Sequence, residues 1–353
     1  MIIYHDTDVT VWQLEQVGSV GTQCSLDEFL DSNDTKVACY HVPFPDETTW
    51  IDRFNTTYPQ ADHTYIFCSE LYDATVEQLI GLDRDHVTML VCGVINYEFK
   101  HANVVPWMDW FIIPTYFYRI VNPDFLNEQL VAQANKPKKF DMLLGMLREH
   151  RTFAYNYVKA RPELDRQGIV TYFKTVHGTL LDNPQFILDD PGVTLINPIQ
   201  FSIDNVDYYG HKMNLSTIVP LKVYNSSYYS VVAETNYSNL YNFYTEKIVK
   251  PIISGRLFVA VAGQHYLRNL KSLGIETFGS VIDESYDTVA DPRRRWTMAM
   301  QQIEYLCLQD PVEIYNKIQP IIEHNRRVLL EKDWQADVSE ILSQSLDAVG
   351  NSK

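Results

Sequence analysis

The sequence predicts an α/β protein with two domains, and three observations support this prediction. Apolar, β-branched runs recur along the 353-residue chain and alternate with segments of helical periodicity. This order is typical of a mainly parallel sheet that is covered by helices on both faces. The pattern begins again after a polar, basic segment, and a chain of this length normally forms two domains. Two such domains create a cleft between them, which is a common place for a ligand.

In the first half, four short apolar runs are predicted to be strands, at residues 36–42, 64–69, 86–93 and 110–114. Residues 73–82 are predicted to form a helix. The apolar residues Val76, Leu79 and Ile80 recur there at helical spacing and therefore share one face.

The second half repeats this order. Strands are predicted at residues 140–144, 168–174, 228–233 and 257–262. Helices are predicted at residues 149–159, 246–254, 294–308 and 311–331, with a short piece near 338–346. Residues 132–139 are polar and basic and contain a proline, so we expect a linker there. The predicted domains are residues 1–135 and 136–353.

The charge is distributed unevenly between these halves. Residues 1–135 contain 20 acidic and 5 basic side chains, a balance of −15, whereas the remainder contains 25 and 24, a balance of −1. An acidic domain repels phosphate backbones, so nucleic-acid binding by this half is not expected. The near-neutral half could still bind an anion locally.

Cysteine usage and hydropathy indicate a cytoplasmic location. The five cysteines are odd in number and form no CxxC pair, which suits a reducing compartment. The start of the chain lacks the pattern of a signal peptide. No stretch of about 18 apolar residues predicts a membrane span.

Several common catalytic and metal-binding motifs are absent from the sequence. It contains no GxxxxGK[ST], GxGxxG, GxSxG or HExxH motif, and its ten histidines lack ligand spacing. Residues 6–8 and 83–85 have the form Asp-x-Asp, which metal-dependent sugar transferases use to hold a divalent cation. Neither segment follows a long buried strand, so we expect solvated turns and no metal site.

Two arginines lie at the predicted start of the helix at residues 149–159. Arg148 and Arg151 are three residues apart and therefore share a face at the helix entry. A helix N-terminus disfavours cations, so arginines concentrated there indicate an anion held by helix N–H groups and guanidinium groups together. The alternative is that they are solvated and paired with Glu149 or nearby acids. Spacing alone leaves both interpretations open.

The second informative segment is residues 228–263. A hydrophobic strand places Glu234 at its C-terminal end, where open α/β sheets bind ligands. After a loop rich in Asn and Tyr, Thr245 is a natural N-cap, followed by Glu246 and Lys247 in the first helical turn. A bound phosphate would explain a lysine at this position. The alternatives are an exposed Glu–Lys pair, which contributes little, and tyrosines that serve packing alone.

The segment ETNY…YTEKIVKPIISGRLFVAVAG resembles the C-terminal signature of the family-ten α-1,3/1,4-fucosyltransferases. In that family a strand ends in Glu-Asn, a loop leads to Thr-Glu-Lys at the start of a helix, and a strand ending in Gly follows. Arg151, in REHRTFAYNYV, is similar in role to an arginine of the same domain. The continuation HYLRNLKSLGIETFGSVIDESYD resembles fucosyltransferase-like proteins from viruses of marine microbes. The resemblance is close over residues 228–263 and loose over 136–310.

This resemblance implies the GT-B architecture, in which two Rossmann-like domains face a cleft. It implies an inverting glycosyltransferase that needs no metal and moves a sugar, first of all fucose from GDP-fucose, to a hydroxyl of a glycan acceptor. A viral origin would place the protein in the host cytoplasm. The implied donor-binding residues are Arg148, Arg151, Glu234, Asn236, Tyr244, Thr245, Glu246 and Lys247.

The acceptor hydroxyl needs a carboxylate base in the N-terminal domain. Family members place a Glu directly after a Gly that ends a strand, but here Gly93 is followed by Val94. Glu70 and Glu98 are therefore the candidate catalytic residues, with Asp109 as a further substitute.

The family's Glu-Asn is also altered, to Glu-Thr-Asn at residues 234–236.

Two other functions stay open. One is a catalytically degenerate transferase fold that acts as a binding protein. The other is a transferase that modifies DNA bases, which the acidic half opposes.

Overall fold

The computed structural model describes residues 1–6, 22–42, 49–68, 71, 73–112, 114–122, 124–130, 135–145, 147–172, 192–195 and 206–334, and also residues 336, 340 and 344. Internal contacts divide the chain into two compact units. The first unit comprises Met1–Asp109 with Asp333–Lys353, and the second comprises Trp110–Lys332. The domain boundary expected at residues 135/136 stays a prediction.

The first unit contains a six-stranded parallel sheet with the order β2-β1-β3-β4-β5-β7. Its strands are β1 (Ile2–His5), β2 (Thr22–Cys24), β3 (Lys36–Val42), β4 (His63–Cys68), β5 (Val87–Val91) and β7 (Asn103–Pro106). The other elements are β6 (Val94–Ile95), α2 (Leu26–Asp31), α3 (Thr49–Thr57), η1 (Tyr58–Gln60) and α4 (Asp73–Ile80).

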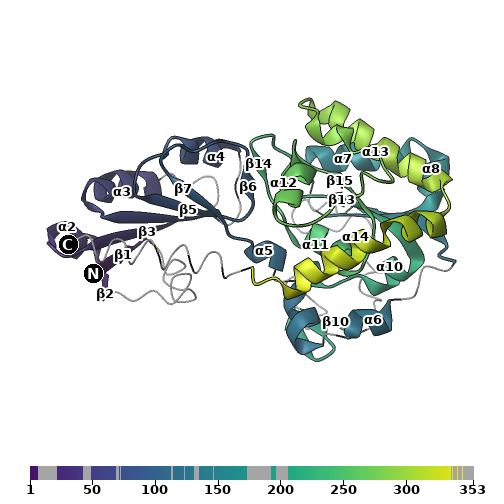
Figure 1. Cartoon of the computed structure of the whole chain (residues 1–353), viewed down its shortest axis with the longest axis horizontal. Helices are drawn as coiled ribbons and strands as arrows, with labels where there is room; N and C mark the ends of the chain where they lie inside the picture. The colour runs from purple at the N-terminus through teal and green to yellow at the C-terminus, as the bar shows by residue number, and fades with distance from the viewer. Residues whose placement is uncertain are drawn as a thin grey trace. The chain divides into compact units, whose positions relative to one another are not determined.

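The central strands of this sheet are buried along nearly their whole length. Every residue of β4 is buried, and so is every residue of β3 except His41. Continuous apolar strands are typical of parallel sheets that are covered on both faces. Helix α3 packs against β3, where Tyr40 contacts the rings of Trp50 and Phe54 (Figure 1).

The second unit contains a four-stranded parallel sheet with the order β15-β13-β8-β9. Its strands are β8 (Lys138–Leu144), β9 (Gly168–Tyr172), β13 (Ser227–Ala233) and β15 (Phe258–Val261). A small antiparallel sheet consists of β10 (Val193–Leu195), β11 (Val206–Tyr208) and β12 (His211–Met213), and β14 is Tyr241–Asn242.

Helices cover both faces of the four-stranded sheet (Figure 1). The helices on one side are α7 (Glu149–Lys159), α8 (Pro162–Gln167) and α13 (Pro292–Leu308), and those on the other side are α10 (Leu221–Ser226), α11 (Glu246–Ile253) and α14 (Pro311–Glu331). The shorter elements are α5 (Asp109–Ile112), η2 (Phe117–Val121), α6 (Phe125–Gln129), η3 (Leu215–Thr217), α12 (Tyr266–Ser272) and η4 (Ser285–Thr288). The predicted α/β fold with two parallel sheets is confirmed.

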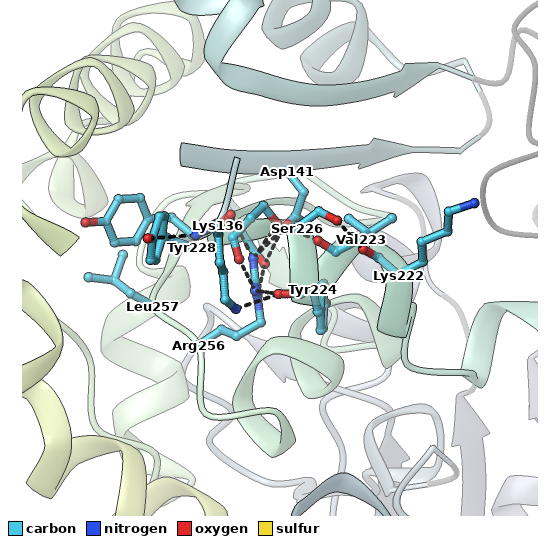
Figure 2. Close-up of polar contacts among 12 residues, drawn as sticks. Lys136, Asp141, Lys222, Val223, Tyr224, Ser226, Tyr228, Arg256 and Leu257 are labelled. Atoms are coloured by element: carbon cyan, nitrogen blue, oxygen red, sulfur yellow. Dashed lines mark hydrogen bonds and ion pairs between the residues drawn. The ribbon is translucent and has the colours of Figure 1, made fainter. Parts of the chain in front are cut away.

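A buried ion pair joins the strands of the second sheet (Figure 2). The Arg256 guanidinium pairs with the Asp141 carboxylate, and both side chains are almost completely enclosed. The same carboxylate oxygen accepts hydrogen bonds from the hydroxyls of Ser227, at 2.8 Å, and Ser230, at 3.2 Å. Buried charges are costly unless they are paired and hydrogen-bonded, so this cluster specifies how β8, β13 and the start of β15 pack together.

The strand predicted at residues 110–114 is wrong. Residues Asp109–Ile112 form helix α5, and the last strand of the first sheet is β7, which pairs with β5. Periodicity cannot distinguish a short apolar run in a strand from one in a helix. Strand β7 is largely exposed and ends at Pro106, as an edge strand can. Lys138 and Lys139, expected in a linker, belong to β8.

Most other predicted elements agree with the structure to within one or two residues at each end. The predicted short helix near residues 338–346 lies almost entirely outside the described residues, as does the end of the strand predicted at 168–174. Within the described ranges, no helix combines the length and apolar character that crossing a bilayer requires.

Candidate functional site

The candidate site begins with Glu234, directly after β13. Strand β13 is buried throughout, because it lies between β8 and β15. Its end carries Glu234 into an enclosed position with 0% exposure. The carboxylate accepts hydrogen bonds from the Thr245 hydroxyl at 2.7 Å, the Thr245 N–H at 3.2 Å and the Tyr266 hydroxyl at 3.0 Å. Glu234 thereby connects the strand end to the start of α11 and to α12.

The first turn of α11 adds two charged side chains. Thr245 caps this helix, since its hydroxyl accepts the Lys247 backbone N–H at 3.3 Å. The Lys247 ammonium group lies 2.6 Å from a carboxylate oxygen of Glu246. Burial raises the pKa of Glu246, but Lys247 and Lys250 outweigh this effect, and the net pKa lies below its ordinary value. Glu246 is therefore a buried, ionised carboxylate, and not the exposed partner of a surface pair.

Helix α7 brings the predicted arginines to the same strand end. Arg151 is only 3% exposed. Its guanidinium donates to the backbone carbonyl of Glu234 at 2.9 Å and to that of Ala233 at 3.3 Å. Burial lowers the Arg151 pKa, while the Glu234 carboxylate acts in the opposite direction. Arg148 is half-buried at the N-cap position, where its backbone is extended.

The three predicted cations, Arg148, Arg151 and Lys247, all lower the pKa of one buried histidine. The pKa of His150 is lowered to about 3, first by burial and then by Arg151, with smaller effects from Arg148 and Lys247. The His150 Nε2 lies 2.7 Å from the Glu234 carbonyl. Its Nδ1 has no hydrogen-bond partner among the described residues. Positive charge and two helix N-termini therefore converge on the C-terminal end of β13, an arrangement suited to an anion.

Two other predicted residues lie in structural positions. Tyr244 is buried, and its hydroxyl donates to the Tyr266 carbonyl at 2.7 Å. Its ring packs against those of Tyr266 and Phe111. The Asn236 side-chain carbonyl accepts the Ser238 N–H at 2.6 Å and closes a turn in the loop after Glu234. The structure thus brings Arg148, Arg151, Glu234, Thr245, Glu246 and Lys247 together, and places Tyr244 in the core beside them.

The candidate bases belong to the first unit. Glu98 is exposed, in the loop after β6. Glu70 lies outside the described residues, and so does the side chain of Asp109, the first residue of α5. The roles of Glu70 and Glu98 as catalytic bases stay predictions.

Of the two Asp-x-Asp segments, the structure describes the second completely. The Asp83 carboxylate accepts the backbone N–H groups of Lys100, His101 and Ala102, each at 2.8 Å. Asp83 therefore organises the loop before β7. The Arg84 guanidinium lies over the rings of Phe54 and Tyr58.

Residues that sequence reasoning missed complete the site. Arg295 is buried and holds the loop after Glu234, because it donates to the carbonyls of Ala262, at 3.0 Å, and Tyr237, at 3.5 Å. Lys250 lies one helical turn after Glu246, a spacing that could have indicated its effect on that carboxylate. No sequence pattern indicated His150 or Tyr266, since their partners are distant along the chain.

These observations define the class of the protein. It is an α/β protein with two parallel sheets, of six and four strands, each forming a Rossmann-like domain as in the GT-B architecture. Comparison with protein-family models, with curated proteins and with solved structures finds no match to this chain. The function of the protein is therefore inferred from the residues of the site.

Proposed function

We propose that the protein is an inverting glycosyltransferase whose second unit binds a nucleoside-diphosphate sugar, with GDP-fucose as the first candidate donor and a glycan hydroxyl as the acceptor. The observation that carries this proposal is the convergence of Arg151 and Lys247 on the end of β13, where Glu234 and Glu246 are also buried. Strand ends of this kind are where open parallel sheets bind ligands.

The chemistry of the residues suits a diphosphate leaving group. As the sugar departs, negative charge develops on the diphosphate, and fixed cations stabilise that charge without reorganisation. Arg148, Arg151 and Lys247 supply such charge from two helix N-termini. The ionised Glu246 can accept hydrogen bonds from the ribose hydroxyls. The acceptor base belongs to the first unit, with Glu70 and Glu98 as the proposed residues.

Nucleotide binding tests this proposal directly. GDP-, UDP- and ADP-sugars are titrated by calorimetry into the intact chain and into Lys247→Ala. We expect one class of nucleotide to bind, and we expect Lys247→Ala to weaken its binding about tenfold or more, because a charge-assisted hydrogen bond is lost. The matched control is Lys317→Ala, which removes an exposed lysine from α14. Absence of binding by all three nucleotides would refute the proposal.

The second candidate function is a catalytically degenerate transferase fold that binds a ligand without turning it over. Val94, in place of a carboxylate after Gly93, favours this alternative. Measured sugar transfer or donor hydrolysis that disappears in Lys247→Ala would exclude it. Nucleotide binding without any turnover would favour it over the transferase.

A further inference from the structure

A second cationic pocket lies at the opposite edge of the same sheet. It encloses about 230 Å³, and its polar lining comes from Asn127, Lys136, Ser254, Arg256, Gln319 and Arg326. Lys136 precedes β8, and Arg256 precedes β15, so the pocket is at the N-terminal edge of these parallel strands. The candidate donor site is at their C-terminal edge. The two sites therefore use different side chains of the same unit.

The positive charge in this pocket is only partly balanced. Of its three cations, Arg256 has a carboxylate partner, Asp141. The Lys136 ammonium group donates to the backbone carbonyl of Tyr224 at 2.6 Å, and Arg256 shares that carbonyl at 2.9 Å (Figure 2). Arg326 donates to the side-chain carbonyl of Asn127 at 2.8 Å. No acidic residue is among the described residues that line the pocket.

The pKa shifts of two of these cations reflect their burial. The pKa of Lys136 is lowered to about 7, first by burial and then by Arg256, whereas Asp141 acts in the opposite direction. Burial also lowers the pKa of Arg326. In addition, the Ser254 hydroxyl is buried and has no hydrogen-bond partner among the described residues. An anion in the pocket would satisfy these groups together.

We propose that this pocket is a second anion-binding site that takes a small oxyanion group, either a phosphate or a carboxylate. Leu126, Leu130 and Ile322 also line the pocket, so it has room for a short apolar part of the same molecule. The ligand differs from a nucleotide sugar, because the volume suits a small metabolite. The site is independent of the proposed transferase activity.

A calorimetric titration with sulfate tests the charge requirement. Every protein carries Lys247→Ala, which weakens the candidate donor site, and the ionic strength is held constant with chloride. We expect Arg326→Gln to weaken sulfate binding about tenfold or more, because one charge-assisted hydrogen bond is lost. The matched control is Arg327→Gln, the exposed neighbour on α14, which should change the affinity less than about twofold.

The comparison of Arg326→Gln with Arg327→Gln is repeated in chains that keep Lys247. A folding defect caused by Lys247→Ala then cannot explain the result. In those chains Arg326→Gln should weaken one class of sulfate site about tenfold or more and leave the other class unchanged. Equal sulfate affinity in Arg326→Gln and Arg327→Gln would overturn the proposal. A parallel titration with malonate distinguishes the two sources, since tighter binding of sulfate indicates a phosphate ligand and tighter binding of malonate a carboxylate.

The pH dependence gives an independent readout for Lys136. The titratable and charged groups around its ammonium group are Tyr224, Tyr228, Asp141, Arg256 and Arg326. Because Lys136 loses its charge as the pH rises through about 7, sulfate affinity should fall across this range and binding should take up protons. Sulfate itself does not titrate there. An affinity that stays constant with pH would contradict the proposal.

Discussion

At the scale of single residues, Glu234 connects several elements of the candidate donor site. It is fully enclosed, yet its carboxylate accepts hydrogen bonds from Thr245 and Tyr266, and its backbone carbonyl accepts one from Arg151. Burial raises the pKa of Glu234 above its ordinary value, although Lys247 opposes this effect. Ionisation of Glu234 therefore lowers the free energy of unfolding.

This cost predicts a particular pH dependence of stability. A folded-state pKa raised above the unfolded value of 4.5 means that the Glu234 contribution is fully present below that value and is lost as the pH rises through the folded pKa. We expect the free energy of unfolding of the wild-type chain to fall, relative to Glu234→Gln, as the pH rises from about 4.5. Urea denaturation at several pH values measures this difference.

The control for this experiment is Glu313→Gln, which changes an exposed carboxylate of α14. Its stability relative to wild type should not follow the same trend with pH. A difference between wild type and Glu234→Gln that does not vary with pH would contradict the assigned pKa shift.

At the scale of elements, the end of β15 and the loop after β13 fit together without space for another side chain. A Cβ atom at Gly263 would lie 2.0 Å from the Ser238 carbonyl oxygen and 2.9 Å from the Asn242 side chain. The nearer atom belongs to the backbone and cannot move aside alone. This contact explains why a glycine is required two residues after the end of β15.

Gly263→Ala should therefore destabilise the protein by about 1–3 kcal/mol, the usual cost of overpacking. Gly145→Ala is the matched control, because its new Cβ would meet nothing nearer than Arg151 Nη1, at 3.8 Å, which is an ordinary contact. Urea denaturation compares the two variants. We also expect Gly263→Ala to weaken nucleotide binding, since the displaced loop begins at Glu234. Equal stability of both variants would argue against the contact.

At the scale of the whole molecule, the two parts of the chain differ in net charge. The net charge is −16, of which −15 belongs to residues 1–135. Six cations of the remainder lie in two places: Arg148, Arg151 and Lys247 in the candidate donor site, and Lys136, Arg256 and Arg326 in the second cationic pocket. Such local positive charge suits small anions better than a polyanion, which would also meet the acidic half.

We therefore expect no binding of double-stranded DNA, even at low salt, where phosphate contacts are strongest. A gel-shift assay measures this, with a basic DNA-binding protein as the positive control. A retarded band that disappears as salt is added would contradict the expectation. Such a band would support the alternative that the protein is a transferase that modifies DNA bases.

Much of the fold was predictable from local patterns, because long periodic segments define their own secondary structure. The bounds of β3, α7 and α14 agree with the predictions. The prediction was wrong at residues 110–114, where four apolar residues before a proline suit a helix as well as a strand. Strand β7 was missed because it is short and mostly exposed.

The candidate site was predictable where its residues are neighbours along the chain. Glu234, Thr245 and Lys247 belong to one strand–loop–helix segment, and the strand end and the N-cap identified them. His150 and Arg295 were not predictable, because their roles depend on backbone carbonyls that other elements supply. The ring of Tyr244 is buried, and its expected place at the ligand stays a prediction.

By itself, the sequence determined the α/β class, the order of most elements and the uneven charge, since these depend on periodicity and composition. Only the tertiary structure decided which cations lie in the same site. Parallel pairing of β8 with β13 brings Arg151 to the Glu234 carbonyl, and the start of β15 brings Arg256 to Asp141. Electrostatic effects depend on the distance between charges and on their burial. Residues far apart in sequence become close and buried only when the chain folds.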